Sequence, residues 1–253
     1  SYHRTMTQVA NRFTVATDLD GLEMPLGGTD YRIKREGDLY FVRTKPTGAP
    51  DSAYGRPQQI ALLTGSHHLQ IFWTETGEGR TLGQFPFAYM VEDKRWTPVQ
   101  HTFLVPPERE ESLYSKGDWN VACMNCHVTH GRSRPADNGK FDSEVSEFGI
   151  ACEACHAGGR EHIEKNRNPL RRFALHWLGG KDTTIANPAR MSGPEASLVC
   201  GQCHSIWAFN NPADQQKWSR EGGHYRPGQK ELDLRWVAQP QGADHAAERA
   251  SLT

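Results

Sequence analysis

The sequence is poor in the features that bury a chain in a membrane or attach it to nucleic acid. Hydrophobic residues make up 36% of the 253 residues, and the mean hydropathy is −0.71, which is low for a chain that must build its own core. No apolar run approaches the roughly 18 residues that a membrane-spanning helix needs. The formal charge is −1, so there is no basic excess of the kind that binds nucleic acid. We therefore expect neither a transmembrane segment in this chain nor a nucleic-acid partner.

Cysteine is absent outside one repeated pattern. All six cysteines fall into three C-x-x-C-H frames, at residues 123–127, 152–156 and 200–204. This frame is the attachment signature of c-type haem. Two thiols on one helical turn reach both vinyl groups of a haem, and the adjacent histidine ligates the iron from the proximal side. The frames predict three covalently bound haem c groups, attached through Cys123, Cys126, Cys152, Cys155, Cys200 and Cys203, with His127, His156 and His204 as proximal iron ligands.

Other uses of paired cysteines fit the spacing less well. Zinc ribbons also pair C-x-x-C frames, but the 29 positions from Cys123 to Cys152 are longer than the typical zinc-knuckle gap, and the third pair would have no partner. A thioredoxin-like redox motif is expected once, beside a βαβ pattern. A disulfide framework does not require histidine after every second cysteine. Haem attachment is the interpretation that uses every cysteine.

Histidine is in excess, with 12 residues. The three proximal ligands leave nine, and bis-histidine ligation of three haems needs three of them. Methionine sulfur is the other option, but the surplus favours two imidazoles, which give a lower reduction potential than a His/Met pair. The first distal candidate is His162, which follows the second frame on a short helical stretch. The other distal candidates are His67 and His68 at a turn-to-strand junction, His130 three residues after His127, and His3.

The attachment chemistry also predicts the compartment. Thioether attachment in bacteria takes place outside the cytoplasm, so we expect a periplasmic or extracellular protein. The sequence starts at Ser1 without a basic and apolar leader, as expected if a leader has been removed or the chain is a fragment.

The expected fold class is α+β with low regular structure, divided into three domains. Residues 1–107 carry strand-like runs and turn signals, and are predicted to form a small antiparallel β element that supplies distal haem ligands. Residues 108–210 hold all three frames and are predicted to form a trihaem cytochrome c domain of short helices and loops. Residues 211–253 are polar and spaced by prolines, and are predicted to form an extended C-terminal tail. Haems that replace part of the core would explain the low hydropathy.

More local predictions concern single elements. The strand-like runs are 31–34, 39–43, 68–73 and 99–105, with a hairpin turn at 36–38 and a second turn at 76–79. A short helix is predicted over 161–165, ending near Pro169.

Several segments resemble the multihaem cytochrome c superfamily, and in particular the branch of the tetrahaem cytochrome c of hydroxylamine oxidation. They are residues 148–159 with His162, the S-x-H-x-x-M segment 1–6, and 37–42, 65–68 and 85–105. Relatives usually carry a further C-x-x-C-H before the S-x-H-x-x-M segment, and often Gly-Pro-Gly where this chain has Ala157-Gly158-Gly159. The missing frame is expected if the chain is a piece of a longer protein, in which case some histidines ligate haems carried elsewhere.

The predicted function is electron transfer by hopping between haems, as part of a respiratory or photosynthetic complex or a haem wire. Its partners would be redox proteins, including other cytochrome subunits or copies of itself. The alternative is a multihaem oxidoreductase in which a haem with an open coordination site acts on a small nitrogen compound or a peroxide. Acid–base groups would then be expected beside that haem, and the candidates are His130, Arg132, Arg134 and Tyr114.

Overall fold

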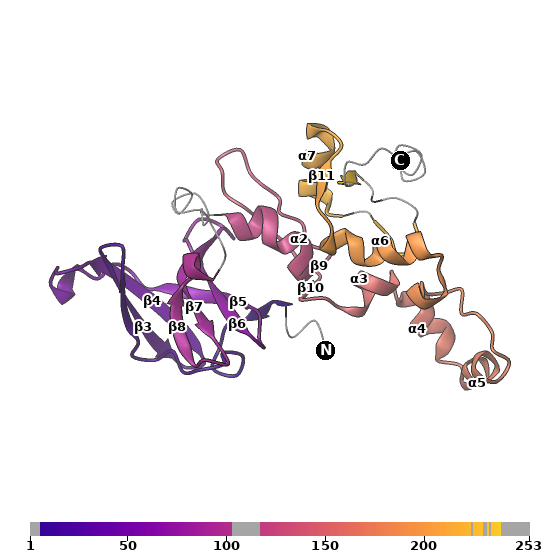
Figure 1. Cartoon of the computed structure of the whole chain (residues 1–253), viewed down its shortest axis with the longest axis horizontal. Helices are drawn as coiled ribbons and strands as arrows, with labels where there is room; N and C mark the ends of the chain where they lie inside the picture. Colours follow the sequence, from indigo (N-terminus) through magenta and orange to yellow (C-terminus); the bar gives the residue numbers. More distant parts are fainter. Residues whose placement is uncertain (1–5, 103–116, 224, 230–231, 233, 239–253) are drawn as a thin grey trace. The chain divides into compact units, whose positions relative to one another are not determined.

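The computed structural model of the chain describes residues 6–102, 117–223, 225–229, 232 and 234–238. By its internal contacts the chain divides into two compact units, residues 1–149 and 150–253 (Figure 1). The boundary between the units falls inside the predicted domain 108–210. The three-domain division stays a prediction.

The first unit is built on an eight-stranded antiparallel sheet (Figure 1). The sheet order is β2-β3-β4-β5-β6-β7-β8, and β1 pairs with β5. The strands are β1 (Gln8–Val9), β2 (Glu23–Leu26), β3 (Thr29–Glu36), β4 (Leu39–Pro46), β5 (Gln58–Thr64), β6 (Leu69–Glu75), β7 (Leu82–Met90) and β8 (Arg95–Pro98). Each strand after β2 pairs with its predecessor in the sequence, so the sheet is a meander.

Local sequence signals place the hairpins. Glu36 pairs with Leu39, so β3 and β4 are joined by a two-residue loop in which Gly37 has a φ of +62°. Glycine reaches this left-handed region without steric cost, which is why the turn forms there. The predicted turn at 76–79 is also confirmed, between β6 and β7.

The sheet folds around an aromatic and aliphatic core of its own. Tyr31 on β3 contacts Phe85 and Phe87 on β7 at ring-centroid distances of 5.8 and 5.7 Å, although β3 and β7 are four places apart in the sheet. The sheet therefore curls until strands from its two ends face each other across the core. The fully buried members of this core include Leu19, Ile33, Tyr40, Ile60, Leu63, Phe72 and Phe85.

The expected fold class is wrong about the amount of regular structure and the size of the β element. Low regular structure and a small β element were predicted, whereas the largest element is a nearly closed eight-stranded sheet, and short helices and loops do not dominate the described chain. The overall hydropathy was misleading because the sheet gathers its apolar side chains into two buried clusters, one on each of its faces. A modest apolar fraction is then enough for a dense core.

The opposite side of the sheet carries the first frame. A second buried cluster joins Leu62, Ile71 and Trp73 on the strands to Trp119 and Met124. These last two residues lie on η4 (Trp119–Cys123), a π-helical turn, and α2 (Met124–His127), which continue into the short strand β9 (Val128–Thr129) paired with β10 (Glu147–Phe148).

The remaining elements of this unit are the 3-10 turns η1 (Asp51–Ala53) and η2 (Val99–His101). The strand predicted over 99–105 is wrong for 99–101, because β8 ends at Pro98 and a 3-10 turn follows. Residues 103–105 lie outside the described residues.

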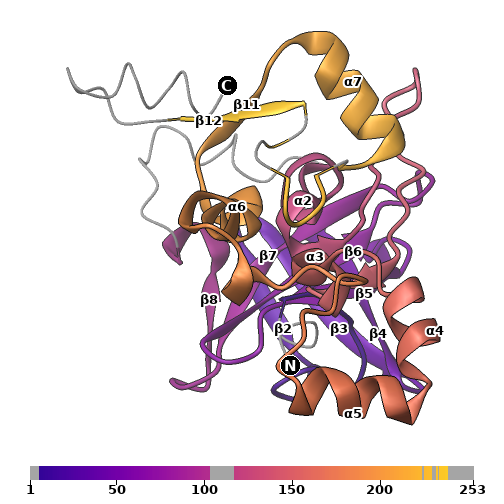
Figure 2. The same cartoon turned by 90° about the vertical axis from the view of Figure 1, so that its right-hand side faces the viewer.

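The second unit is mainly helical (Figure 2). Its elements are α3 (Cys152–His156), α4 (Arg160–Asn166), α5 (Pro169–Trp177), η5 (Pro188–Arg190), α6 (Gly193–His204), β11 (Trp207–Phe209), α7 (Pro212–Glu221) and β12 (Arg235–Val237), with β11 paired to β12. The helix predicted over 161–165 is confirmed as α4. None of the helices in the described ranges is long and apolar enough to cross a membrane.

The described part of 211–253 is not an extended tail. Pro212 opens helix α7, and the side chain of Asn211 caps that helix by accepting a hydrogen bond from the backbone N–H of Asp214. Proline was taken as a sign of extended chain, but at the first helical position its missing N–H costs nothing.

Candidate functional site

Each C-x-x-C-H frame lies on a helical turn. The first runs from the end of η4 through α2, the second is α3, and the third is the last turn of α6. Two cysteines three positions apart on such a turn share one face. All six are free thiols; Cys152 and Cys200 are exposed and the other four half-buried. The thiols are thus paired and accessible, as attachment to the two vinyl groups of one haem requires.

The first frame is the most buried one. Burial, followed by the nearby charge of Asp118, raises the pKa of Cys123 to about 11. Burial also lowers the pKa of His127, which keeps the imidazole in the neutral form that binds iron. The Nδ1 atom of His127 lies 3.4 Å from the carbonyl oxygen of Met6. A carbonyl only accepts, so Nδ1 carries the hydrogen, and Nε2 keeps the lone pair that a proximal ligand needs.

Two buried polar atoms beside the first frame have no partner among the described residues. They are Nε1 of Trp119, four residues before Cys123, and Oγ1 of Thr7, next to Met6. Trp119 is 3% exposed and Thr7 is 1% exposed. Buried polar groups are almost always hydrogen-bonded, so these donors are suited to a polar group that the described residues do not supply. Haem propionates are such a group.

The second frame holds its histidine in the same tautomer. His156 Nδ1 donates to the carbonyl oxygen of Ala186 over 2.8 Å, and the backbone N–H of Ala186 donates to the carbonyl of His156 over 3.1 Å. Helix α3 ends at Ala157, which has a φ of +60°. Glu153 closes the following turn by accepting from the N–H of Gly159 over 2.8 Å. Nε2 of His156 is therefore the atom available to iron.

The third frame is tied to the second by Gln202, which stands between its two cysteines. The amide nitrogen Nε2 of Gln202 donates to the carbonyl oxygen of Ala154 in α3 over 2.9 Å. In turn, Arg235 on β12 donates to the carbonyl oxygen of Gln202 over 3.1 Å. The Arg235 guanidinium packs against two neighbouring indole rings, 4.4 Å from the centroid of Trp207 and 4.0 Å from that of Trp218.

Gln202 and Arg235 were not among the predicted site residues. The two intervening positions of a C-x-x-C-H frame take no part in attachment, so a long amide side chain at one of them is a weak signal. Arg235 lies in the segment that was expected to be an extended tail. Its role depends on the pairing of β11 with β12, which no local pattern indicated.

His162, the first distal candidate, is held by a carboxylate. Its Nδ1 atom lies 3.1 Å from Oδ2 of Asp182. Hydrogen bonds from Thr184, with further ones from Asn166 and the charge of Arg171, hold the pKa of Asp182 far below its ordinary value. Asp182 was not among the predicted site residues, because an isolated aspartate twenty positions from a histidine carries no pattern.

The other distal candidates are dispersed. His67 and His68 lie in the loop between β5 and β6, where His67 Nδ1 is 3.0 Å from Ser66 Oγ and His68 Nδ1 is 3.1 Å from Glu92 Oε1. His130 follows β9 with a φ of +50°. His3 lies outside the described residues. As with His162, their roles as distal ligands stay predictions.

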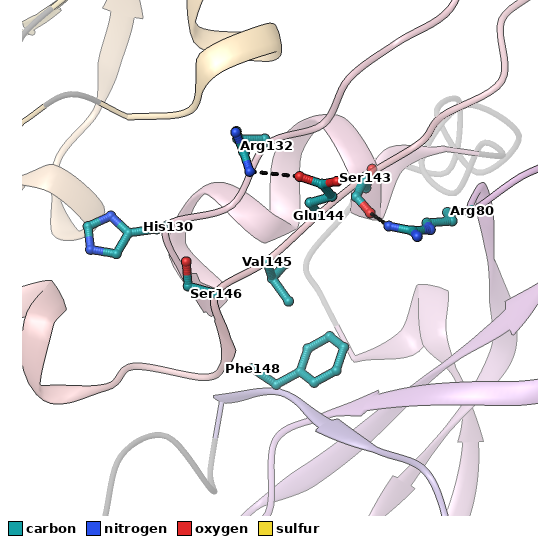
Figure 3. A pocket seen from close by; sticks show the side chains of 8 residues that line it. All are labelled: Arg80, His130, Arg132, Ser143, Glu144, Val145, Ser146 and Phe148. Carbon is teal, nitrogen blue, oxygen red and sulfur yellow. Dashed lines mark hydrogen bonds and ion pairs between the residues drawn. The ribbon is translucent and has the colours of Figure 1, made fainter.

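His130 lines a cavity of about 420 Å³ in the first unit (Figure 3). Arg132 also lines it and donates to Glu144 over 2.7 Å, while Arg80 donates to the carbonyl oxygen of Ser143 over 3.0 Å. Of the acid–base candidates for an enzyme, His130 and Arg132 thus share one cavity. Arg134 instead pairs with Asp142 and Glu144, and Tyr114 lies outside the described residues.

Within the described ranges, no group of three or more His, Cys, Asp or Glu side chains is arranged to hold a single metal ion. The residues that are present suit haem c. They provide paired accessible thiols, two frame histidines with Nδ1 bonded to a backbone carbonyl, and buried donors without a partner in the described part of the chain.

Comparison with known proteins agrees with this geometry. Residues 103–157, which include the first two frames, match the family described as "Cytochrome c554 and c-prime". No curated protein matches the chain. The solved structure described as "Crystal Structure of Outer Cell Wall Cytochrome OcwA" is similar at 20% identity and a TM-score of 0.38, covering 72% of this chain and 32% of that one. A TM-score this low does not establish a shared fold. The family match and the three frames support a c-type cytochrome with covalently bound haem.

Proposed function

We propose that the chain is an exported multihaem cytochrome that binds three haem c groups and carries electrons by hopping between them. Haem c supplies the one-electron chemistry, and the protein holds the groups in place and sets their potentials through ligands, burial and hydrogen bonds. In this proposal the chain works outside the cytoplasm, as part of a periplasmic or extracellular complex or of a haem wire. The wire would be formed with other cytochrome subunits or with further copies of this chain.

The observation that carries the proposal is the link between two frames. Gln202, inside the third frame, donates to Ala154, inside the second, over 2.9 Å. Cys200 also lies close enough to Cys155 to contribute, after burial, to the raised pKa of the Cys155 thiol. Electron transfer between neighbouring haems needs attachment sites that are held close together, and this hydrogen bond joins the centres of two such sites.

The chain's own residues also suit electron transfer. Carbonyl acceptors on Nδ1 fix the ring orientation of His127 and His156, so that the ligand does not rearrange when the charge of the iron changes. A rigid ligand keeps the reorganisation on electron transfer small, since the protein groups around the iron keep their positions in both oxidation states. No side chain has to react in this role.

The test is haem stoichiometry followed by spin state. A pyridine haemochrome assay with intact mass is expected to give three haems per chain. The double variants C123A/C126A, C152A/C155A and C200A/C203A, which remove both thiols of one frame, are each expected to lose one. A count of three that stays unchanged in any of these variants would contradict attachment at that frame.

Low-temperature EPR distinguishes the carrier from the alternative enzyme. A carrier with six-coordinate haems is expected to show low-spin ferric signals that do not change on addition of nitrite, hydroxylamine or peroxide. The cavity that His130 shares with Arg132 is the observation that favours an oxidoreductase with an open haem. A high-spin signal that shifts with nitrite and disappears in H130Q would establish that alternative.

A further inference from the structure

We propose that Asp182 is a positioning residue for an axial haem ligand: its carboxylate fixes His162 so that the Nε2 atom of the ring faces iron. This inference rests on the proposed function, since it assumes bound haem. It adds a residue and a role that the motif pattern does not contain.

The two oxygens of Asp182 have separate tasks. Oδ1 accepts from the backbone N–H of Thr184 over 2.9 Å, from the Thr184 hydroxyl over 2.5 Å and from Arg171 Nη2 over 3.0 Å. Oδ2 lies 3.1 Å from His162 Nδ1 and accepts from Asn166 Nδ2 over 2.7 Å. One oxygen is anchored by three donors, and the other is therefore held in a fixed position against the imidazole.

The tautomer of His162 follows from counting hydrogens. Asn166 Nδ2 carries two, and they are directed to Asp182 Oδ2 and to the carbonyl oxygen of His162 at 2.7 and 2.9 Å. Neither is left for His162 Nδ1, although the two nitrogens are 3.1 Å apart. A carboxylate can only accept, so Nδ1 is the protonated nitrogen and Nε2 carries the lone pair.

The surroundings leave that lone pair accessible. His162 lines a cavity of about 410 Å³, together with Arg172, His176 and Asp182. Its side chain is 37% exposed, whereas that of Asp182 is 17% exposed. The acid is thus the more enclosed partner and the imidazole the accessible one. A carboxylate behind a ligating histidine fixes the ring and makes the far nitrogen a stronger donor to a metal.

The expected consequence is a ferric state stabilised at one haem. An imidazole bonded to a carboxylate donates more electron density to iron, which lowers the reduction potential of that haem. His176 shares the cavity, and no carboxylate among the described residues pairs with it as Asp182 pairs with His162, so H176Q is the matched control for H162Q.

The experiment uses the haem-loaded chain, with EPR, redox titration and carbon monoxide binding to the reduced protein. H162Q is expected to turn one low-spin haem high-spin, and H176Q to leave all haems low-spin. D182N, which keeps the shape of the side chain, is expected to raise the midpoint potential of that same haem. It is also expected to weaken the histidine–iron bond by roughly 10- to 100-fold, so that carbon monoxide binds more readily.

T184V gives an outcome of opposite sign and protects the test against a folding defect. It removes one donor from Oδ1, makes the carboxylate a stronger acceptor, and is expected to lower the potential of that haem. Unchanged potentials and spectra in D182N would overturn the inference, as would unchanged spectra in H162Q. The haem content distinguishes failure of this inference from failure of the proposed function. Three attached haems together with unchanged spectra and potentials in the variants would reject only the role of Asp182, whereas absence of haem would reject the proposed function.

Discussion

Gln202 donates a hydrogen bond from its side-chain amide to the backbone carbonyl of Ala154 over 2.9 Å, so a residue inside one C-x-x-C-H frame holds the centre of another. The same amide nitrogen also donates to the carbonyl of Val199 over 2.9 Å. One side chain thereby joins α3 to α6, and the relative placement of two attachment sites depends on it.

Replacing Gln202 by leucine is expected to loosen this pair. The loss of its hydrogen bonds should lower the free energy of unfolding by about 1 kcal/mol. It should also alter the magnetic interaction between the second and third haems, seen as a change in EPR line shape. Q216L, at an exposed position of α7, is the control and should change neither. Identical EPR spectra for Q202L and the parent protein would show that the contact does not set the haem pair.

Replacing Ala157 by glycine is expected to stabilise the second frame. Ala157 has a φ of +60° and a ψ of −174°, a region open to glycine in which other residues carry strain of about 1–3 kcal/mol. Glycine's extra chain entropy offsets about 0.5–1 kcal/mol of that gain, so A157G should raise the free energy of unfolding by about 1 kcal/mol, measured by denaturant titration.

The control for A157G is the same substitution where no strain exists. A174G lies in the exposed middle of α5 and should destabilise by about 1 kcal/mol. A loss of stability in A157G would contradict the strained conformation.

Glu144 is expected to make part of the stability of the first unit depend on acid. A hydrogen bond from Arg134, with the charges of Arg134, Arg132 and Arg80, lowers the pKa of Glu144 from its ordinary value of 4.5. A lowered folded-state pKa means that the stabilisation is complete above about pH 5 and is lost as the pH falls through the lowered value. The free energy of unfolding of E144Q should therefore fall less than that of the parent protein as the pH is lowered below about 5. Denaturant titration at a series of pH values measures this difference.

Two further measurements check the cause. R134Q removes the first partner of Glu144 and should flatten the same part of the pH curve. Salt at 1 M, where the screening length is about 3 Å, should weaken the effect in the parent protein. An unchanged acid limb in both variants would show that other carboxylates govern it.

Phe85 is expected to be essential to the sheet whether or not haem is bound. Its side chain is 1% exposed and contacts Tyr31, Phe72 and Phe87 at centroid distances of 5.6 to 6.5 Å. F85A should lower the free energy of unfolding by about 3–5 kcal/mol, since the core cannot collapse fully onto the cavity. F13A, at a site that is 71% exposed, should change it by less than about 0.5 kcal/mol.

The haem-free protein provides the decisive comparison. If haems replaced the core of this region, as low hydropathy suggested, F85A would have little effect beyond that of losing haem. If the core is made of side chains, F85A should lose the same large amount of stability in the haem-free and the haem-loaded protein. Thermal unfolding monitored by circular dichroism measures this loss.

Hairpins and short helices could be predicted because their signals are local. The Gly37 turn and helix α4 are set by a few neighbouring residues, and both were found where expected. The extent of the sheet could not be predicted, because it depends on the pairing of strands and on aromatic contacts such as Tyr31 with Phe85. Helix α7 was missed because the proline at its first position was interpreted as a break.

The sequence by itself determined the attachment chemistry, since two thiols and a histidine within five positions are brought together by a single helical turn wherever it lies in the fold. Only the tertiary structure decided what stands behind each histidine. The acceptor for His127 is 121 residues away, that for His156 is 30 away, and that for His162 is 20 away. Contacts of this kind arise from packing between distant segments, and no spacing in the chain encodes them. The type of group that is bound is thus determined by a short local motif, whereas the orientation of its ligands depends on the folded chain.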